Sequence, residues 1–296
     1  MKNNCFDRPI IILSAPRSGS TLLYEVLSKN RHLSSIGGES HAVIESIPGL
    51  NIAARKFDSN ELTADDASPE VIRRLHQGFL QNLKSSTGSP LEIGLNDNFR
   101  FLEKTPKNSL RIDFLNKAFP DAMFVYLVRD PRDNVSSIMQ AWRSNRFRTY
   151  PQLPGWNGDW SLLLPKNWKS LLGKPIEQIA AFQWSQANNA IVDSLNKLPS
   201  ERWKIVRYEQ LIDDPSNTVK AICDFCQIPF DDNLATLCDS PLPHSQYTLS
   251  APKKDKWLAN YKEVKSIWPN LSPVIARLNE KLTLRKLPLL PLQWQE

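Results

Sequence analysis

The chain has 296 residues, of which 41% are hydrophobic and 23% are charged, and its formal net charge is +6. That balance excludes a disordered, collagen-like or coiled-coil protein and leaves enough apolar material for a sizeable core. Four cysteines are too few for a disulfide scaffold, so we expect a reducing, cytoplasmic location. No apolar run approaches the roughly 18 residues of a membrane span, and the first residues lack a signal-peptide core.

The basic charge is concentrated in two segments. Residues 129–148 carry five arginines and two aspartates, and residues 251–265 carry five lysines, one aspartate and one glutamate. Neither segment has the repeated basic face, interleaved with aromatic residues, that is typical of a nucleic-acid track. The distribution therefore favours a phosphate-rich small molecule, and not nucleic acid, as the partner.

Buried strands alternate with amphipathic helices along the chain. Residues 10–13 form a continuous β-branched and apolar run, residues 122–128 read as a central strand, and residues 203–208 read as a third strand. Apolar residues recur at helical spacing after each of these runs. The alternation predicts an α/β fold with a parallel sheet, formed by a single domain over residues 1–296.

Two more helices are predicted before the central strand. Ser68 and Pro69 have the residue types of an N-cap and a first helical position. Thr105 and Pro106 open a second predicted helix, which runs to Phe119 and ends before a proline.

Residues 149–175 differ in composition from the rest of the chain. They combine four prolines, three glycines and three tryptophans, which predicts an irregular aromatic insertion. Two interpretations stay open: a flap that seals the core, and a lid over an acceptor site.

The clearest sign of chemistry is the loop Ala15-Pro16-Arg17-Ser18-Gly19-Ser20-Thr21, between the first strand and its helix. Such a turn directs backbone N–H groups and a helix N-terminus toward one place, which suits an anion. In the loop of nucleotide triphosphatases a lysine follows the second glycine, but here Ser20 follows Gly19 and the cation is Arg17. We therefore expect a phosphate-like group to bind, and not Mg-ATP.

A second anion site is indicated after the central strand. Arg129 follows that strand directly, and Ser137 lies two turns into the next helix. Since ligands of open α/β sheets lie at the carboxyl ends of the strands, this pair can hold a second phosphate, separate from the one at Arg17. Alone, the segment is typical of an exposed Arg/Asp helix start, and its combination with the first loop favours the phosphate.

These motifs resemble those of the sulfotransferases that use 3′-phosphoadenosine-5′-phosphosulfate (PAPS). The resemblance rests on the first loop, on the RDPRDNVSS segment at 129–137 and on the KIVRYEQLIDDP segment at 204–215, and it is closest to the tyrosylprotein and bacterial branches. It implies a P-loop-like central parallel sheet flanked by helices. It also implies sulfuryl transfer from PAPS to a hydroxyl or amine, with adenosine 3′,5′-bisphosphate (PAP) as product and no metal.

The resemblance assigns donor contacts residue by residue. It implies that the 5′-phosphosulfate contacts Arg17, Ser18, Gly19, Ser20 and Thr21. It implies that the 3′-phosphate contacts Arg129 and Ser137, and that Tyr208 lies near the donor. It also implies a donor-closing segment at 240–265, in which Lys256 contacts the donor. Lys253 and Lys254 compete with Lys256 for the last role, and Ser245 and Ser250 are weaker implied contacts.

The implied catalytic residues are Lys104, Arg17 and a base. Lys104 takes the position of a lysine that precedes a helix, and Pro106 stands where the cytosolic branch has its catalytic histidine. The tyrosylprotein branch uses a glutamate at the end of its second strand, a position that Glu39 takes here at the end of 34–39. His41, two residues on, is the competing candidate for the base.

Other readings of the chain stay open. A P-loop kinase and a non-catalytic binder of phosphorylated nucleotides are the alternative functions. Cys223 and Cys226 have the spacing of a metal or redox pair, but an apolar helix favours core positions for them. The acceptor pocket is expected from residues 40–100 and 149–175, whose content favours a lipid-like, polyketide or aromatic small molecule.

Overall fold

The computed structural model describes residues 5–94, 97–249 and 255–294 of the chain. The strands are β1 (Ile10–Leu13), β2 (Leu102–Lys104), β3 (Met123–Val128), β4 (Arg148–Tyr150), β5 (Trp160–Ser161) and β6 (Trp203–Arg207). The α-helices are α1 (Ser20–Leu27), α2 (His41–Glu45), α3 (Pro69–Gln81), α4 (Ile112–Ala118), α5 (Pro131–Arg143), α6 (Ile176–Leu195), α7 (Tyr208–Asp213), α8 (Pro215–Cys226), α9 (Asp232–Cys238) and α10 (Tyr261–Leu284). The short 3₁₀ helices are η1 (Ala64–Asp66), η2 (Pro106–Leu110), η3 (Trp168–Leu171), η4 (Ser200–Arg202) and η5 (Lys256–Asn260).

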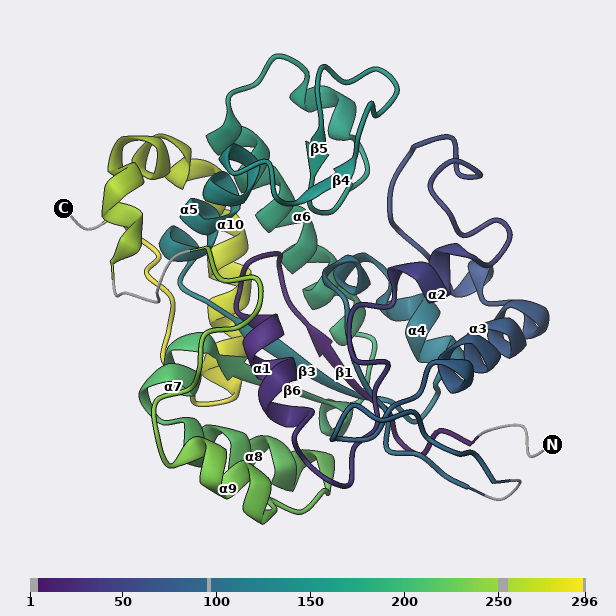
Figure 1. Ribbon diagram of the computed structural model, residues 1–296. Helices are drawn as coiled ribbons and strands as arrows, with labels where there is room; N and C mark the ends of the chain where they lie inside the picture. The colour runs from purple at the N-terminus through teal and green to yellow at the C-terminus, as the bar shows by residue number, and fades with distance from the viewer. Residues whose placement is uncertain (1–4, 95–96, 250–254, 295–296) are drawn as a thin grey trace.

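The central sheet is parallel, and its strand order is β2-β1-β3-β6 (Figure 1). Every residue of β1 and β3 is buried, as the continuous apolar runs predict for strands covered on both faces. In β1, Ile10 and Ile12 face one apolar cluster while Ile11 and Leu13 face the other. Helices α1, α8 and α9 pack on the first face, and α4, α5, α6 and α10 pack on the second. The predicted α/β fold is confirmed.

The helix starts are placed as the sequence predicts. The side chain of Ser68 accepts a hydrogen bond from the N–H of Val71 and caps α3. Asp130 caps α5 by accepting from the N–H of Arg132, and Asp214 caps α8. Because Asp130 directly follows Arg129, the cap of α5 also fixes the point where Arg129 leaves the sheet.

Three predicted elements differ in their extent. The helix predicted from Pro106 to Phe119 is wrong as one helix, because η2 and α4 are separate and Arg111 between them has φ −132°. The buried guanidinium of Arg111 donates to the carbonyl of Asn60 and to Glu45, which holds the chain in this bend. The predicted strand at 34–39 is reduced to isolated bridges at Ser34 and Ser35. Finally, β6 ends one residue early, and Tyr208 begins α7.

The insertion at 149–175 is tied to the core by aromatic packing. Trp160 is fully buried, and its ring packs edge-on against Trp142, Trp156 and Trp168 at centroid distances of 5.2, 4.8 and 5.6 Å. Its indole N–H donates to the carbonyl of Leu163 at 3.0 Å. These contacts anchor the insertion to the core of the molecule.

No helix in the described part of the chain is long and apolar enough to cross a membrane.

The buried tryptophan gives a stability prediction. Trp160→Ala removes a fully buried indole from a well-packed cluster, so we expect the free energy of unfolding to fall by about 3–5 kcal/mol in urea denaturation. The matched control is Leu172→Ala in the same insertion, because Leu172 is 49% exposed and its loss should cost within about 0.5 kcal/mol. Equal losses for the two variants would contradict this account of the insertion.

Candidate active site

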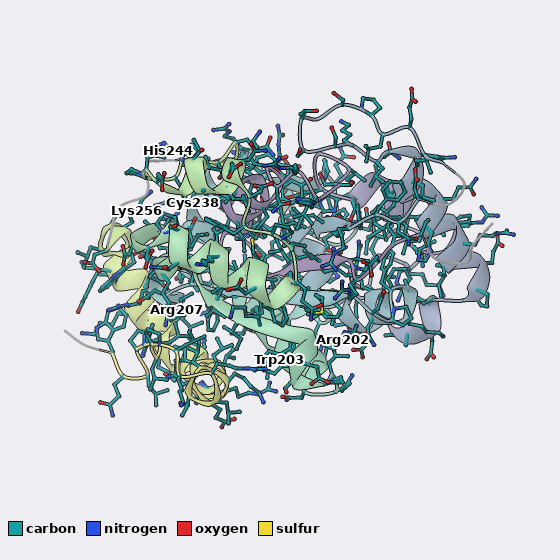
Figure 2. The ribbon with its side chains drawn as sticks, turned by 90° about the horizontal axis from the view of Figure 1, so that it is seen from below. Arg202, Trp203, Arg207, Cys238, His244 and Lys256 are labelled. Carbon is teal, nitrogen blue, oxygen red and sulfur yellow. The ribbon has the colours of Figure 1, made fainter. Side chains whose placement is uncertain are left out.

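One cavity of about 510 Å³ lies at the carboxyl ends of the central strands. Its wall includes the loop after β1, the start of α5, the first residue of α7 and part of the β4–β5 hairpin. Figure 2 shows β6 running from Trp203 toward Arg207, with Lys256 and His244 on the Arg207 side. The cavity therefore occupies the edge of the sheet at which ligands of open α/β folds bind.

The conformation of the loop after β1 requires a glycine at position 19. Gly19 has φ +93°, and a Cβ at this position would stand 2.4 Å from the ring of Tyr208. Glycine is required here by both the backbone conformation and the close approach of that ring. Arg17, Gly19, Ser20 and Thr21 line the cavity. The hydroxyl of Ser18 instead donates to Ala15 and Asn134 in the interior, which leaves its backbone as the group available for an anion.

Arg17 is held in the cavity wall by an aromatic ring and a backbone carbonyl. Its guanidinium lies 4.5 Å from the centroid of the Phe147 ring and donates to the carbonyl of Tyr247 at 3.0 Å. Burial, with the nearby charges of Arg129 and Arg146, lowers the pKa of Arg17 to about 10. Its Nε is buried and has no hydrogen-bond partner among the described residues. An unpaired donor beside a second arginine favours an anionic ligand at this place.

Arg129 and Arg17 enter the same cavity. The guanidinium of Arg129 donates to the backbone carbonyl of Arg17 at 3.2 Å and lies 4.7 Å from the centroid of the Tyr208 ring. Ser137, from the second turn of α5, lines the same wall. The two arginines thus lie on one side of the sheet and in one cavity, the arrangement that two neighbouring phosphate sites require.

Lys256 reaches this wall because η5 docks on α5. The N–H of Trp257 donates to Asp133 at 3.1 Å, and the side chain of Asn260 donates to Ser136 at 2.8 Å. Burial, together with the charge of Arg129, lowers the pKa of Lys256. Ser245 also lines the cavity, whereas Ser250, Lys253 and Lys254 lie outside the described residues.

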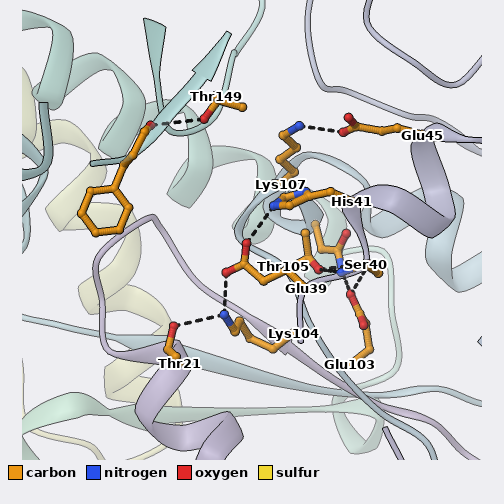
Figure 3. Close-up of polar contacts among 12 residues, drawn as sticks. Thr21, Glu39, Ser40, His41, Glu45, Glu103, Lys104, Thr105, Lys107 and Thr149 are labelled. Atoms are coloured by element: carbon orange, nitrogen blue, oxygen red, sulfur yellow. Dashed lines mark hydrogen bonds and ion pairs between the residues drawn. The ribbon is translucent and has the colours of Figure 1, made fainter. Parts of the chain in front are cut away.

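Glu39 and His41 line the cavity, and the buried Lys104 reaches Glu39 from the end of β2 (Figure 3). The Nζ of Lys104 donates to Oε1 of Glu39 at 2.7 Å and to the hydroxyl of Thr21 at 3.1 Å. The Nε2 of His41 lies 2.7 Å from Oε2 of Glu39. One carboxylate therefore joins the predicted catalytic lysine to the competing base, and Thr21 links all three to the loop after β1.

The charge of Glu39 is fixed by its two partners. Burial alone would raise its pKa, but the hydrogen bond with His41 and the charge and hydrogen bond of Lys104 outweigh burial and hold the pKa at about 2. Glu39 is therefore ionised near neutral pH, and the Nε2 of His41 donates to it. While Lys104 is in place, Glu39 is a weak base.

Several wall residues were not predicted as site residues. Phe147 and Tyr247 face each other edge-on with ring centroids 6.3 Å apart, from segments a hundred residues apart in the chain. Glu45 and Lys107 form an ion pair of 2.7 Å on the opposite wall, where Tyr150 covers Lys107. No local motif indicates the two aromatic residues as site residues. Lys107 lies three residues after Lys104, and this spacing could have indicated it.

The cavity wall takes few residues from the segments predicted for the acceptor pocket. From residues 40–100 it takes His41 and Glu45, and from 149–175 it takes Thr149, Tyr150, Leu162 and Leu163. The wall also takes several residues between Leu242 and Leu249, inside the segment 240–265 that the resemblance implies for donor closure.

The cysteine pair belongs to the core. Cys223 and Cys226 are fully buried in the apolar cluster on the α8 face of the sheet, as the core interpretation predicts. Burial raises the pKa of each thiol to about 12. Within the described ranges, no group of three or more His, Cys, Asp or Glu side chains could hold a metal ion.

A family model described as the Sulfotransferase family matches residues 9–232, which include both predicted anion sites and Lys104. The chain belongs to the sulfotransferase family. The family suggested by the motifs is thus confirmed.

Curated relatives agree with this family. The chain is similar to protein-tyrosine sulfotransferase A of Caenorhabditis elegans, with 25% identity over 228 residues that cover 76% of this chain and 51% of that protein. Human protein-tyrosine sulfotransferase 1 is 29% identical over 136 residues, or 45% of this chain and 34% of that protein. The chain spans about half or less of the length of these relatives.

Solved sulfotransferases share the fold. The sulfotransferase of Alicyclobacillus acidocaldarius has a TM-score of 0.53 at 17% identity, with 96% of this chain and 98% of that chain covered. A mouse sulfotransferase complexed with PAP has a TM-score of 0.50 at 14% identity, with 94% and 87% covered. At such identities the likeness is one of fold, and it confirms the predicted P-loop-like sheet flanked by helices.

The ion pair of Glu39 predicts a pH dependence of stability. Because the folded state lowers its pKa from 4.5 to about 2, Glu39 stabilises the fold above pH 4.5, and this contribution is lost as the pH falls toward 2. In Glu39→Gln we expect the free energy of unfolding to change less with pH across this range. Urea denaturation at a series of pH values measures the slope, and equal slopes for the two proteins would contradict the pairing.

Proposed function

We propose that this protein transfers a sulfuryl group from PAPS to a hydroxyl or amine of a small-molecule acceptor. The observation that carries the proposal is the placement of Arg17 and Arg129 in one cavity at the carboxyl edge of the sheet. PAPS carries phosphate groups at both the 5′ and the 3′ position, and two separated arginines match that charge distribution. Four unpaired cysteines support a reducing, cytoplasmic compartment for the protein.

The residues around the cavity fit such a donor. The buried, unpartnered Nε of Arg17 and the N-terminus of α1 suit the 5′-phosphosulfate. Arg129 and Ser137 are the candidates for the 3′-phosphate, with Lys256 beside them. A mouse protein of the same fold is complexed with PAP, which supports this assignment. A bound donor would supply an activated sulfuryl group and a phosphate leaving group.

Lys104 and Arg17 have the charge that the transfer requires. In a loose, in-line transfer, negative charge grows on the leaving phosphate oxygen, and preorganised cations stabilise it where it develops. Lys104 is 2% exposed, so water screens its charge little. Its contact with Thr21 places its ammonium group against the loop that we assign to the phosphosulfate.

The base is Glu39, with His41 as its hydrogen-bonded partner and competitor. Glu39 has a pKa of about 2 while Lys104 is paired with it, and the ammonium group is one of the causes. When Lys104 turns to the leaving oxygen, Glu39 loses a cationic neighbour, so its pKa rises and it accepts a proton more readily. His41 retains the other carboxylate oxygen and keeps the carboxylate oriented.

The acceptor class stays open between apolar and polar small molecules. Leu162, Leu163 and Phe147 offer apolar surface for a lipid-like or aromatic alcohol, whereas Glu45 and Lys107 add a partly buried ion pair to the same wall. An acceptor with one apolar body and one reactive hydroxyl or amine fits both features.

Two ligand experiments separate this function from its alternatives. Calorimetry should show binding of PAP in preference to Mg-ATP, and Arg129→Ala should weaken the binding of PAP, since the arginine is assigned to its 3′-phosphate. Binding of ATP without PAP would support the P-loop kinase instead. Binding of PAP without transfer of radiolabelled sulfate from PAPS to any acceptor pool would support the non-catalytic binder.

Variants of the cavity cations give a further prediction. We expect Lys104→Ala and Arg17→Ala to lower the turnover number by about 10²–10³, because each removes a cation that stabilises the transition state. Glu39→Gln should cost less, since His41, the competing base, remains in the cavity wall. The radiolabelled sulfate assay measures all three, with Lys220→Ala on the exposed side of α8 as the control. Unchanged turnover in Lys104→Ala would refute the role of the lysine.

A further inference from the structure

A buried polar cluster lies directly behind the predicted base. Ser40, the residue between Glu39 and His41, donates its hydroxyl to Oε1 of Glu103 at 2.5 Å. Its backbone N–H donates to the hydroxyl of Thr105 at 2.7 Å. Both groups of Ser40 are thus held by residues of one short segment, at the end of β2.

Strand β2 separates this cluster from the catalytic side. Successive side chains of a strand point to opposite faces, so Lys104 and its neighbour Glu103 point apart. Lys104 reaches Glu39 and Thr21 on the cavity side, while Glu103 reaches Ser40 on the other side (Figure 3). Residues on both faces of β2 therefore hold the turn at 39–41, Lys104 through Glu39 and Glu103 through Ser40.

The burial of the Glu103 carboxyl is energetically unfavourable. It is 1% exposed, and burial raises its pKa. Its Oε1 also accepts from the side chain of Asn108 at 2.9 Å, but its Oε2 has no partner among the described residues. A buried carboxyl with one unsatisfied oxygen lowers stability, which favours a role for Glu103 other than stabilising the fold.

The far end of the same segment is fixed as well. Glu45, the last residue of α2, accepts from Lys107 at 2.7 Å and from Arg111 at 2.9 Å. The segment 39–45 is thus clamped at both ends to the segment 103–111. Its first end is the one that carries Glu39 and His41.

We propose that Glu103 is a positioning residue that acts through Ser40 and, with Thr105, sets the place of Glu39 and His41 against Lys104. This inference deepens the proposed function and rests on it for its kinetic part. A base must meet the acceptor proton at hydrogen-bond distance, and a displacement of about 1 Å can cost about 10²-fold in rate. The network fixes the backbone of the residue between the two candidate bases, so it sets both positions together.

Three substitutions test the network. Ser40→Ala removes the hydroxyl contact, Thr105→Val removes the acceptor of the Ser40 N–H at nearly constant volume, and Glu103→Gln keeps an oxygen acceptor for Ser40. We expect turnover to fall about 10²-fold in Ser40→Ala and Thr105→Val, and to stay within about threefold of the original in Glu103→Gln. The affinity for PAP, measured by calorimetry, should be unchanged in all three, since Ser40 lies behind the cavity wall.

The matched control is Ser109→Ala. Ser109 is 1% exposed in η2, and its hydroxyl donates to Pro106, so its loss removes a buried hydroxyl without touching the turn at 39–41. Its turnover per folded molecule should match the original protein, even if its unfolding temperature falls. Equal turnover in Ser40→Ala and Ser109→Ala would overturn the proposal.

A second measurement does not depend on activity. Nitrogen-15 NMR of the histidine rings, with the His41 signal assigned from His41→Asn, reports whether Nε2 of His41 carries its proton and donates to Glu39. We expect that single form in the original protein and in Glu103→Gln, and a mixture of forms in Ser40→Ala and Thr105→Val. An unchanged His41 signal in the last two would overturn the positioning role. Absence of sulfuryl transfer with a changed signal would reject the proposed function and support the positioning role.

Discussion

Accumulation of positive charge at one edge of the sheet is the constraint on which the rest of the site depends. Burial lowers the pKa of both Arg17 and Lys256, and the charge of Arg129 lowers each of them further, so these cations repel one another in a poorly solvated cavity. The charge of Glu39 raises the pKa of Arg17 and that of Asp133 raises the pKa of Lys256, but burial and the neighbouring cations outweigh them. The buried Nε of Arg17 has no partner among the described residues. Such an arrangement favours an anionic ligand, as the proposed donor would be.

Packing elsewhere in the molecule holds those cations in place. The ring of Tyr208 fills the space that a side chain at position 19 would need, and the same ring lies beside the guanidinium of Arg129. The ring of Phe147 lies beside the guanidinium of Arg17 in the same way. Each arginine therefore lies against an aromatic face, which restricts its motion without neutralising its charge.

Local patterns made much of the fold and site predictable. The apolar runs of β1 and β3, the Ser68 cap and the glycine loop depend on neighbours in the sequence, and each lies where the sequence predicts it. Contacts across the chain were not predictable in the same way. The break at Arg111 follows from bonds to Asn60 and Glu45, and nothing near Phe147 in the sequence indicates that Tyr247 will face it. Helices α6 and α10 were not predicted, because neither carries a sequence motif that belongs to the site.

The contact between Lys104 and Thr21 joins what the sequence treats as separate sites. Thr21 belongs to the loop that we assign to the donor, and Glu39 is the proposed base, yet a single ammonium group donates to both. An anion bound at the loop competes with Glu39 for this ammonium group. Any movement of Lys104 toward that anion raises the proton affinity of Glu39, so donor binding and activation of the base are two results of one displacement. Because Glu103 and Thr105 hold Ser40, the turn that carries Glu39 would keep its place during such an exchange.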